Sequence, residues 1–207
     1  MKKFIVLLIS CLLAFCLFAD EVHESFEQYR TAILAGDDEE AVQYLNQSSI
    51  KYYDDMLKDA LYLKESEFEE RTILDKFMIL RLRMNFSAKE LKKMNGRELI
   101  VYSIQKGWIG KSSVINIELS EESKIKGDWA TIEVMKNGQG SGLHFIFQKE
   151  NDIWKFDIQE ILKIANMSLA YLIKQSDYTE KEFIEMVLEN TDNKKVLKSY
   201  YKPMLKK

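Results

Sequence analysis

The chain has 207 residues, of which 46% are apolar and 30% charged, and its formal net charge is −3 at pH 7. This length and apolar content allow one domain with a sizeable core, and one proline and eight glycines leave no obvious flexible linker. The mildly acidic balance argues against a dedicated nucleic-acid-binding protein, since such proteins carry basic surfaces.

Residues 1–19 have the composition of a secretory signal peptide. Lys2 and Lys3 precede an apolar run over residues 4–18, and Ala19 stands directly before acidic residues. A membrane-spanning helix needs about 20 apolar residues, so this run favours a signal peptide over an uncleaved anchor. We therefore expect cleavage near Ala19 and export to the periplasm or out of the cell.

Both cysteines of the chain, Cys11 and Cys16, lie within this leader. The mature chain would hold no cysteine, which excludes disulfides, thiolate catalysis and cysteine-bound metals. A lipoprotein anchored through Cys16 or Cys11 is the alternative. We favour ordinary cleavage, because Phe15 is large for the residue before a lipidated cysteine and Cys11 leaves a very short apolar run.

The first half of the mature chain has apolar residues at helical spacing. We expect helices at residues 22–35, from about 37, at about 50–63, from 66, from 87 and at 97–106. Gly36 is expected to end the first helix. The pattern Ser-x-x-Glu at Ser66 and Ser87 predicts two capping boxes, the first of which opens a long helix. That helix is expected to bury one stripe, made of Ile73, Phe77, Leu80 and Met84.

Four short alternating runs between Ser112 and Ile158 predict an antiparallel meander with one apolar face. The residues expected on that face are Ile115, Ile117, Leu119, Ala130, Ile132, Val134, Leu143, Phe145, Phe147, Trp154 and Phe156. Helices are expected from Asp157 and, through a further capping box, from Thr179. The predicted class is α+β, with helices on one face of a curved four-stranded meander (residues 20–178) and a C-terminal helical extension with a basic tail (residues 179–207).

The expected turns place Lys136 opposite Ser141 and Lys149 opposite Asp152. They set one polar row across the solvent face of the sheet, made of Asn116, Glu133, His144 and Asp157. In one interpretation the carboxylates raise the pKa of His144, and His144 or Asp157 acts as a catalytic base. In the other, the row is a solvated ladder of opposite charges. We favour the second, because a catalytic base normally lies in a cleft.

Three segments within residues 22–158 resemble the NTF2-like (SnoaL-like) superfamily, with its cystatin-like α+β roll. They are Ala35-Gly36-Asp37 with Ala41 and Leu45, residues 127–134, and Trp154 to Ile158. The resemblance implies a curved sheet around a long helix with a conical pocket between them, in a family of isomerases, dehydratases and non-catalytic binding domains. This chain carries extra helices before and after the sheet, and its apolar face offers no counterpart of the family's catalytic aspartates and histidines.

The leading functional hypothesis is an exported, non-catalytic domain that binds a small apolar ligand or a protein partner of the cell envelope. The residues expected to line the pocket are Tyr102, Trp129, Phe145, Trp154 and Phe156. An isomerase or dehydratase using His144 or Asp157 is one alternative. No motif indicates a cofactor or a metal site.

The second alternative is contact with anionic lipid or an acidic partner through the C-terminal tail. Its lysines are Lys194, Lys195, Lys198, Lys202, Lys206 and Lys207, and apolar residues alternate with them in a basic amphipathic pattern. A run of lysines is more often a solvated surface, which is the interpretation we favour.

Overall fold

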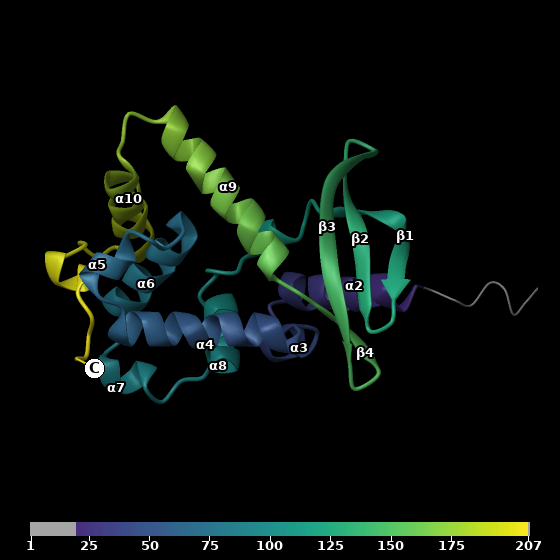
Figure 1. Ribbon diagram of the computed structural model, residues 1–207, viewed down its shortest axis with the longest axis horizontal. Helices are drawn as coiled ribbons and strands as arrows, with labels where there is room; N and C mark the ends of the chain where they lie inside the picture. Colours follow the sequence, from purple (N-terminus) through teal and green to yellow (C-terminus); the bar gives the residue numbers. More distant parts are fainter. Residues whose placement is uncertain (1–19, 207) are drawn as a thin grey trace, which may run out of the picture.

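The computed structural model describes residues 20–206 and shows an elongated α+β fold, with a sheet at one end and a group of helices at the other (Figure 1). The predicted class is confirmed: four antiparallel strands form a meander in the order β1-β2-β3-β4, helices cover one face, and a helical extension follows. The predictions for residues 1–19 lie outside the described residues.

The described helices before the sheet are α2 (Glu21–Ala35), α3 (Asp38–Gln43), α4 (Gln47–Tyr62), α5 (Glu65–Phe68), α6 (Ile73–Asn85), α7 (Ala88–Leu91) and α8 (Gly96–Gln105). The strands are β1 (Glu118–Lys126), β2 (Trp129–Lys136), β3 (Gln139–Glu150) and β4 (Ile153–Phe156). After the sheet come α9 (Gln159–Gln175) and α10 (Glu180–Asp192). Two short 3-10 helices complete the described elements, η1 (Lys111–Ser113) and η2 (Lys198–Tyr201).

Helix starts follow the expected capping chemistry, with one error. Ser87 and Thr179 form the predicted capping boxes at α7 and α10. The prediction that Ser66 opens a long helix is wrong, because α5 already begins at Glu65 and ends within one turn. The long helix is α6, whose cap is Thr72: its hydroxyl accepts the N–H of Asp75. Ser66 and Thr72 are each followed by an acidic residue three positions later. The long helix begins at Thr72, which directly precedes the apolar run.

The first strand lies later than its alternation predicted. Ile115 is 57% exposed and belongs to a turn after η1, so the strand over residues 115–119 is wrong. β1 is an edge strand that pairs with β2 alone, and its register shifts between Leu119 and Ser123. An edge strand buries little of its surface, which is why its sequence is mostly polar.

The inner strands keep the predicted faces but change their pairing. Glu133 lies opposite His144 as expected, and an irregularity beyond Glu133 leaves Leu143 38% exposed instead of buried. Phe156 pairs with Phe147 and not with Phe145, so the predicted register between β3 and β4 is wrong by two residues. The cause is a two-residue turn at 151–152, where both residues have positive φ. A slip of two residues preserves the buried face and moves every cross-strand pair.

Aromatic rings fill the space between the sheet and α2. Phe156 lies at the centre, with ring centroids 5.4 Å from Phe26, 4.9 Å from Phe145 and 5.3 Å from Phe147. All four rings are fully buried, and Tyr29 packs on Phe156 at 5.5 Å. These rings therefore fill the space between the apolar face of the sheet and α2.

Helix α6 occupies the centre of the helical end, and three of its cations are buried: Lys76, Arg81 and Arg83. Each reaches the C-terminal segment. The Nζ of Lys76 donates to Glu180 at the start of α10 (2.8 Å), and Arg83 donates to the carbonyl oxygen of Tyr200 (3.0 Å). Because these charges are paired across the interface, α10 and the tail are bound firmly to α6.

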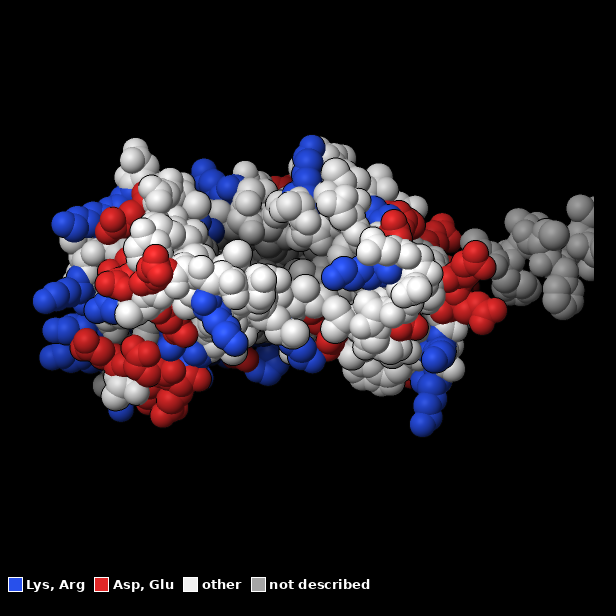
Figure 2. All heavy atoms as spheres, turned by 90° about the horizontal axis from the view of Figure 1, so that it is seen from above, with Lys and Arg blue, Asp and Glu red and all other residues white. Residues whose placement is uncertain are grey.

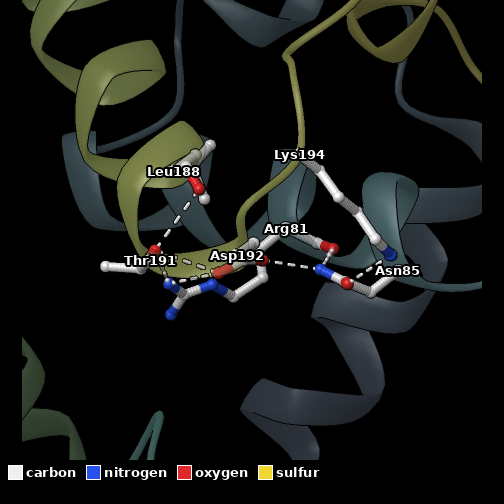
Figure 3. A network of polar contacts seen from close by, with 6 residues as sticks. All are labelled: Arg81, Asn85, Leu188, Thr191, Asp192 and Lys194. Atoms are coloured by element: carbon white, nitrogen blue, oxygen red, sulfur yellow. Dashed lines mark hydrogen bonds and ion pairs between the residues drawn. The ribbon is translucent and has the colours of Figure 1, made fainter.

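Arg81 of α6 contacts the C-terminal end of α10, where it is the centre of a polar network (Figure 3). Its guanidinium donates to Asp192 (2.9 Å) and to the hydroxyl of Thr191 (2.6 Å), and both ionic side chains are almost fully buried. Asn85 donates to the same carboxylate (2.6 Å), and its amide oxygen accepts from Lys194 (2.9 Å). The network joins α6, α10 and the first residues of the tail.

Candidate functional site

The candidate site is a largely enclosed cavity of about 130 Å³ between α2, α4, α6, α9 and the segment 108–113. Its aromatic lining consists of Tyr29, Tyr52, Tyr53 and Trp108. Its aliphatic lining includes Leu74, Met78, Ile158, Ile161, Leu162 and Ala165. No Asp, Glu, Lys, Arg or His of the described residues lines it. A concave, mostly apolar space of this kind is the usual form of a small-molecule site.

Local structure explains why these side chains meet. Tyr29 belongs to the buried face of α2 and Tyr53 to that of α4. The chain turns sharply after α8, where the backbone N–H groups of Trp108 and Ile109 both donate to the carbonyl of Ser103. This turn directs the segment 108–113 across the gap between the helical end and the sheet.

The polar side-chain groups of the lining residues are the hydroxyls of three tyrosines and one serine and the indole N–H of Trp108. The hydroxyl of Tyr52 donates to Asp75 (2.5 Å), and that of Ser113 donates to the carbonyl of Gly110 (2.7 Å). Tyr29 and Tyr53 are both almost fully buried, and within residues 20–206 neither phenol oxygen makes a hydrogen bond. Burial raises the pKa of both phenols, and the charge of Tyr29 would raise that of Tyr53 further. Both hydroxyls therefore stay protonated and neutral.

A second hollow, of about 150 Å³, adjoins the cavity between α4, α6 and α9. The two spaces share Tyr52, Leu74 and Leu162, and the outer one also reaches Asp75 and Lys163. The side chains that the two spaces share are apolar apart from the hydroxyl of Tyr52, and charged residues line only the outer one.

The five residues expected to line a pocket lie in different places. Phe145 and Phe156 belong to the solid aromatic core, and Trp154 is buried beside Ser25, whose hydroxyl donates to its carbonyl (2.5 Å). Trp129 is 48% exposed at the start of β2. Tyr102 packs between Phe86 and Trp108 and lines a separate, open groove at α7 and α8. The structure does not bring the five residues around one cavity.

The polar row of the sheet is only partly assembled. Glu133 and His144 are cross-strand partners, but a carboxylate oxygen of Glu133 accepts the N–H of Gly142 (3.0 Å). Asp157 lies away from His144, where it accepts from the hydroxyl of Ser48 (2.7 Å) and from the N–H of Gln159 (3.0 Å). None of these three residues lines a cavity described above, and residues 20–206 contain no group of acids and histidines able to hold a metal ion.

The C-terminal tail packs on the body of the protein. Val196 is buried, the backbone N–H of Leu205 donates to the carbonyl of Leu61, and Lys194 is held by Asn85. The tail forms η2 and a strap across α4 and α6, so its lysines do not share one helical face. Lys207 lies outside the described residues.

The exposed side of α9 is unusually apolar. Residues 164–173 include no charged side chain, and Met167 and Tyr171 are 65% and 64% exposed. Viewed from above, an uncharged band crosses the middle of this face and is hollowed toward the sheet (Figure 2). In the described part of the chain, no helix is long and apolar enough to cross a membrane.

Comparisons with known proteins identify no protein family that matches the chain, and no curated protein or solved structure that is similar to it.

Sequence reasoning missed the cavity because its lining comes from segments far apart in the chain. Tyr29 and Tyr53 appear in their helices as ordinary inward-facing aromatic residues. The sequence did offer one local sign of unpaired hydroxyls. Tyr52 and Tyr53 are consecutive, and consecutive residues of a helix point in different directions, so one polar partner does not serve both hydroxyls. Only the packing of α2 against α4 shows that Tyr29 joins them.

Proposed function

We propose that this protein is an exported, non-catalytic binding protein that holds a small apolar ligand in the cavity between α2, α4, α6 and α9. The observation that carries the proposal is a partly open, uncharged and largely apolar space of about 130 Å³. An engineered apolar cavity of about 150 Å³ is sufficient to bind benzene, so the space suits a ligand of one small ring. Export is supported by the leader pattern of residues 1–19.

The resemblance to the NTF2-like superfamily remains part of this proposal. A four-stranded meander wrapped around α2, with further helices closing the space, is compatible with such a roll. In this chain the ligand space lies beside the sheet and among the helices, because Phe26 and its aromatic neighbours fill the position of the cone. The extra helices are therefore what creates the proposed site.

The test is ligand binding to the mature chain, measured by two-dimensional NMR with a panel of small neutral aromatic and alicyclic compounds. Binding is expected to shift the amide signals of the segment 108–113 and of the first half of α9. Ala165→Leu adds volume inside the cavity and is expected to abolish these shifts. Ala170→Leu, on the exposed side of the same helix, is the matched control and should leave them unchanged.

A protein partner in the cell envelope is the second candidate, and the exposed apolar side of α9 favours it. A site-specific photo-crosslinker in place of Met167 should then capture one discrete envelope protein in intact cells. The same crosslinker in place of Gln139, at the tip of the β2–β3 hairpin, should not capture it.

An isomerase or dehydratase based on His144 or Asp157 receives less support. Neither residue lines the cavity, and Asp157 is engaged with Ser48 and the start of α9. A contact between the tail lysines and anionic lipid is likewise weaker than the ligand proposal, because the tail is packed against α4 and α6.

A further inference from the structure

The cavity has a chemical preference that its volume alone does not reveal. Two residues of its wall, Tyr29 and Tyr53, carry hydroxyls that make no hydrogen bond to another described residue. A pure hydrocarbon that fills the cavity would leave these donors unsatisfied, at a cost of about 1–3 kcal/mol for each buried donor. A ligand that supplies an acceptor at this position would avoid that cost.

The two tyrosines come from different helices and converge on one space. Tyr29 lies on α2 and Tyr53 on α4, and both line the cavity. Each ring is fixed by its neighbours: Tyr29 packs on Phe156 (5.5 Å) and Tyr53 on the edge of Tyr52 (5.3 Å). Rigid rings on two helices hold their hydroxyls in place, so a ligand would pay little entropy to meet them.

The lining also decides the charge of the ligand. No Lys, Arg or His of the described residues lines the cavity, and Arg81, whose guanidinium packs on Trp108, is already paired with Asp192. A carboxylate or phosphate would thus be buried without a counter-charge, which is strongly unfavourable.

We propose that Tyr29 and Tyr53 select a neutral, ring-sized ligand that carries a hydrogen-bond acceptor, such as a cyclic ketone or a lactone. The two phenols donate to the acceptor oxygen, and the aliphatic wall formed by α6 and α9 encloses the ring. This inference rests on the proposed function, and it names the chemical class of the ligand and the two residues that determine it.

The experiment compares two probes of equal size and shape, cyclohexanone and methylenecyclohexane, by NMR titration of the mature protein. Tyr29→Phe/Tyr53→Phe removes both hydroxyls and leaves the ring volumes unchanged. We expect the double variant to bind cyclohexanone about tenfold more weakly and methylenecyclohexane within about twofold of the wild type. The double variant should be as stable as the wild type, since it loses no hydrogen bond within the protein.

Tyr52→Phe is the matched control. It removes a hydroxyl from the same wall, but one that is already bonded to Asp75, so it should lower stability without changing the preference between the two probes. An equal ratio of the two affinities in the wild type and in the double variant would overturn this inference and leave the proposed function standing. Failure of both probes to bind the wild type would overturn the proposed function, and this inference with it.

Discussion

The two ends of the molecule are stabilised by different chemistry. At the sheet end, Phe26, Phe145, Phe147 and Phe156 meet in a cluster made only of rings. At the helical end, α6 places Lys76, Arg81 and Arg83 inside the protein and satisfies them with partners from distant segments. The sheet end therefore depends on volume and shape, and the helical end on the pairing of buried charge.

The comparison of the two ends shows that a helix can be buried at the centre of a packed region although many of its residues are polar. Helix α6 is buried around most of its surface, although five of its thirteen residues are polar or charged. Arg83 is the clearest case: it is 3% exposed, and its guanidinium donates to four backbone carbonyls, those of Asp59, Ala60, Leu63 and Tyr200. The first three lie at the C-terminal end of α4, where helical carbonyls run out of intrahelical donors; the carbonyl of Asp59 also accepts the N–H of Leu63. Burial lowers the pKa of Arg83 to about 10.

The largest effect is expected at the sheet end. Phe156→Ala should lower the free energy of unfolding by about 4 kcal/mol, because it removes the ring at the centre of the cluster and leaves a cavity. Denaturant unfolding measures this loss. Trp129→Ala, at a half-exposed position on the same sheet, should cost less than about 1.5 kcal/mol. Similar losses for the two variants would show that the ring cluster is not the main source of stability there.

The second-largest loss of stability is expected when the buried cation Arg83 is replaced. Arg83→Met is expected to cost about 3 kcal/mol, since four carbonyls lose a charged donor and those at the end of α4 remain buried. The exposed Arg97, which pairs with Glu39 at 3.2 Å, is the control, and Arg97→Met should cost less than about 0.5 kcal/mol. Chemical denaturation measures both. Equal losses for Arg83→Met and Arg97→Met would show that buried charge does not stabilise the helical end more than exposed charge does.

A smaller loss is expected when only the charge of a buried pair is changed. Asp192→Asn keeps an oxygen that can accept from Arg81 but weakens a hydrogen bond between two charged groups, at an expected cost of about 2 kcal/mol. Thermal unfolding at low and high salt provides the measurement. Because the pair is shielded from solvent, salt should change this cost little, and a loss that disappears in high salt would contradict burial of the pair.

The smallest effect concerns Asp20, which joins α2 to β1. Partial burial raises its pKa, but hydrogen bonds from Ser123, His23 and Val22 outweigh this and hold the pKa below the ordinary value. Its contribution is therefore present above the unfolded pKa of about 3.9 and is lost as pH falls through the lower folded value.

We expect Asp20→Asn to lose about 1 kcal/mol or less at pH 7, as for other helix caps. The variant should converge with the wild type as both are taken below pH 3. Urea unfolding across this pH range measures the difference, and a gap that widens toward low pH would contradict the assigned direction.

Much of the fold could be predicted from local patterns, because caps and alternation act over a few residues. Ser87, Thr179 and Gly36 mark helix ends as expected, and the inward residues of β2 are all buried. The first strand could not be placed, since five alternating residues around Ile115 occur equally well in a turn. The pairing of β3 with β4 depended on the φ angles of the turn at 151–152, which the residue types alone did not determine.

The candidate site was harder to predict than the fold. Tyr29, Tyr53, Trp108 and Ala165 are distant in sequence, and none lies in a motif. The buried cations of α6 were missed for a related reason: a charged residue in a helix is usually solvated, and the partners of these three lie in the last segment of the chain. The polar row on the sheet illustrates the opposite error, because a pairing shift of two residues was enough to separate Asp157 from His144.

The partners of the three buried cations of α6 lie far along the chain: Glu180, Asp192 and Tyr200 follow them by 104, 111 and 117 residues. Lys76 also binds Glu69, and Arg83 also donates to carbonyls of residues 59–63, so these two cations keep partners in a chain that ends before Glu180. Arg81 would lose its counter-charge in such a chain, because its carboxylate partner is Asp192. Removal of residues 180–206 is therefore expected to affect the surroundings of Arg81 more than those of Lys76 or Arg83.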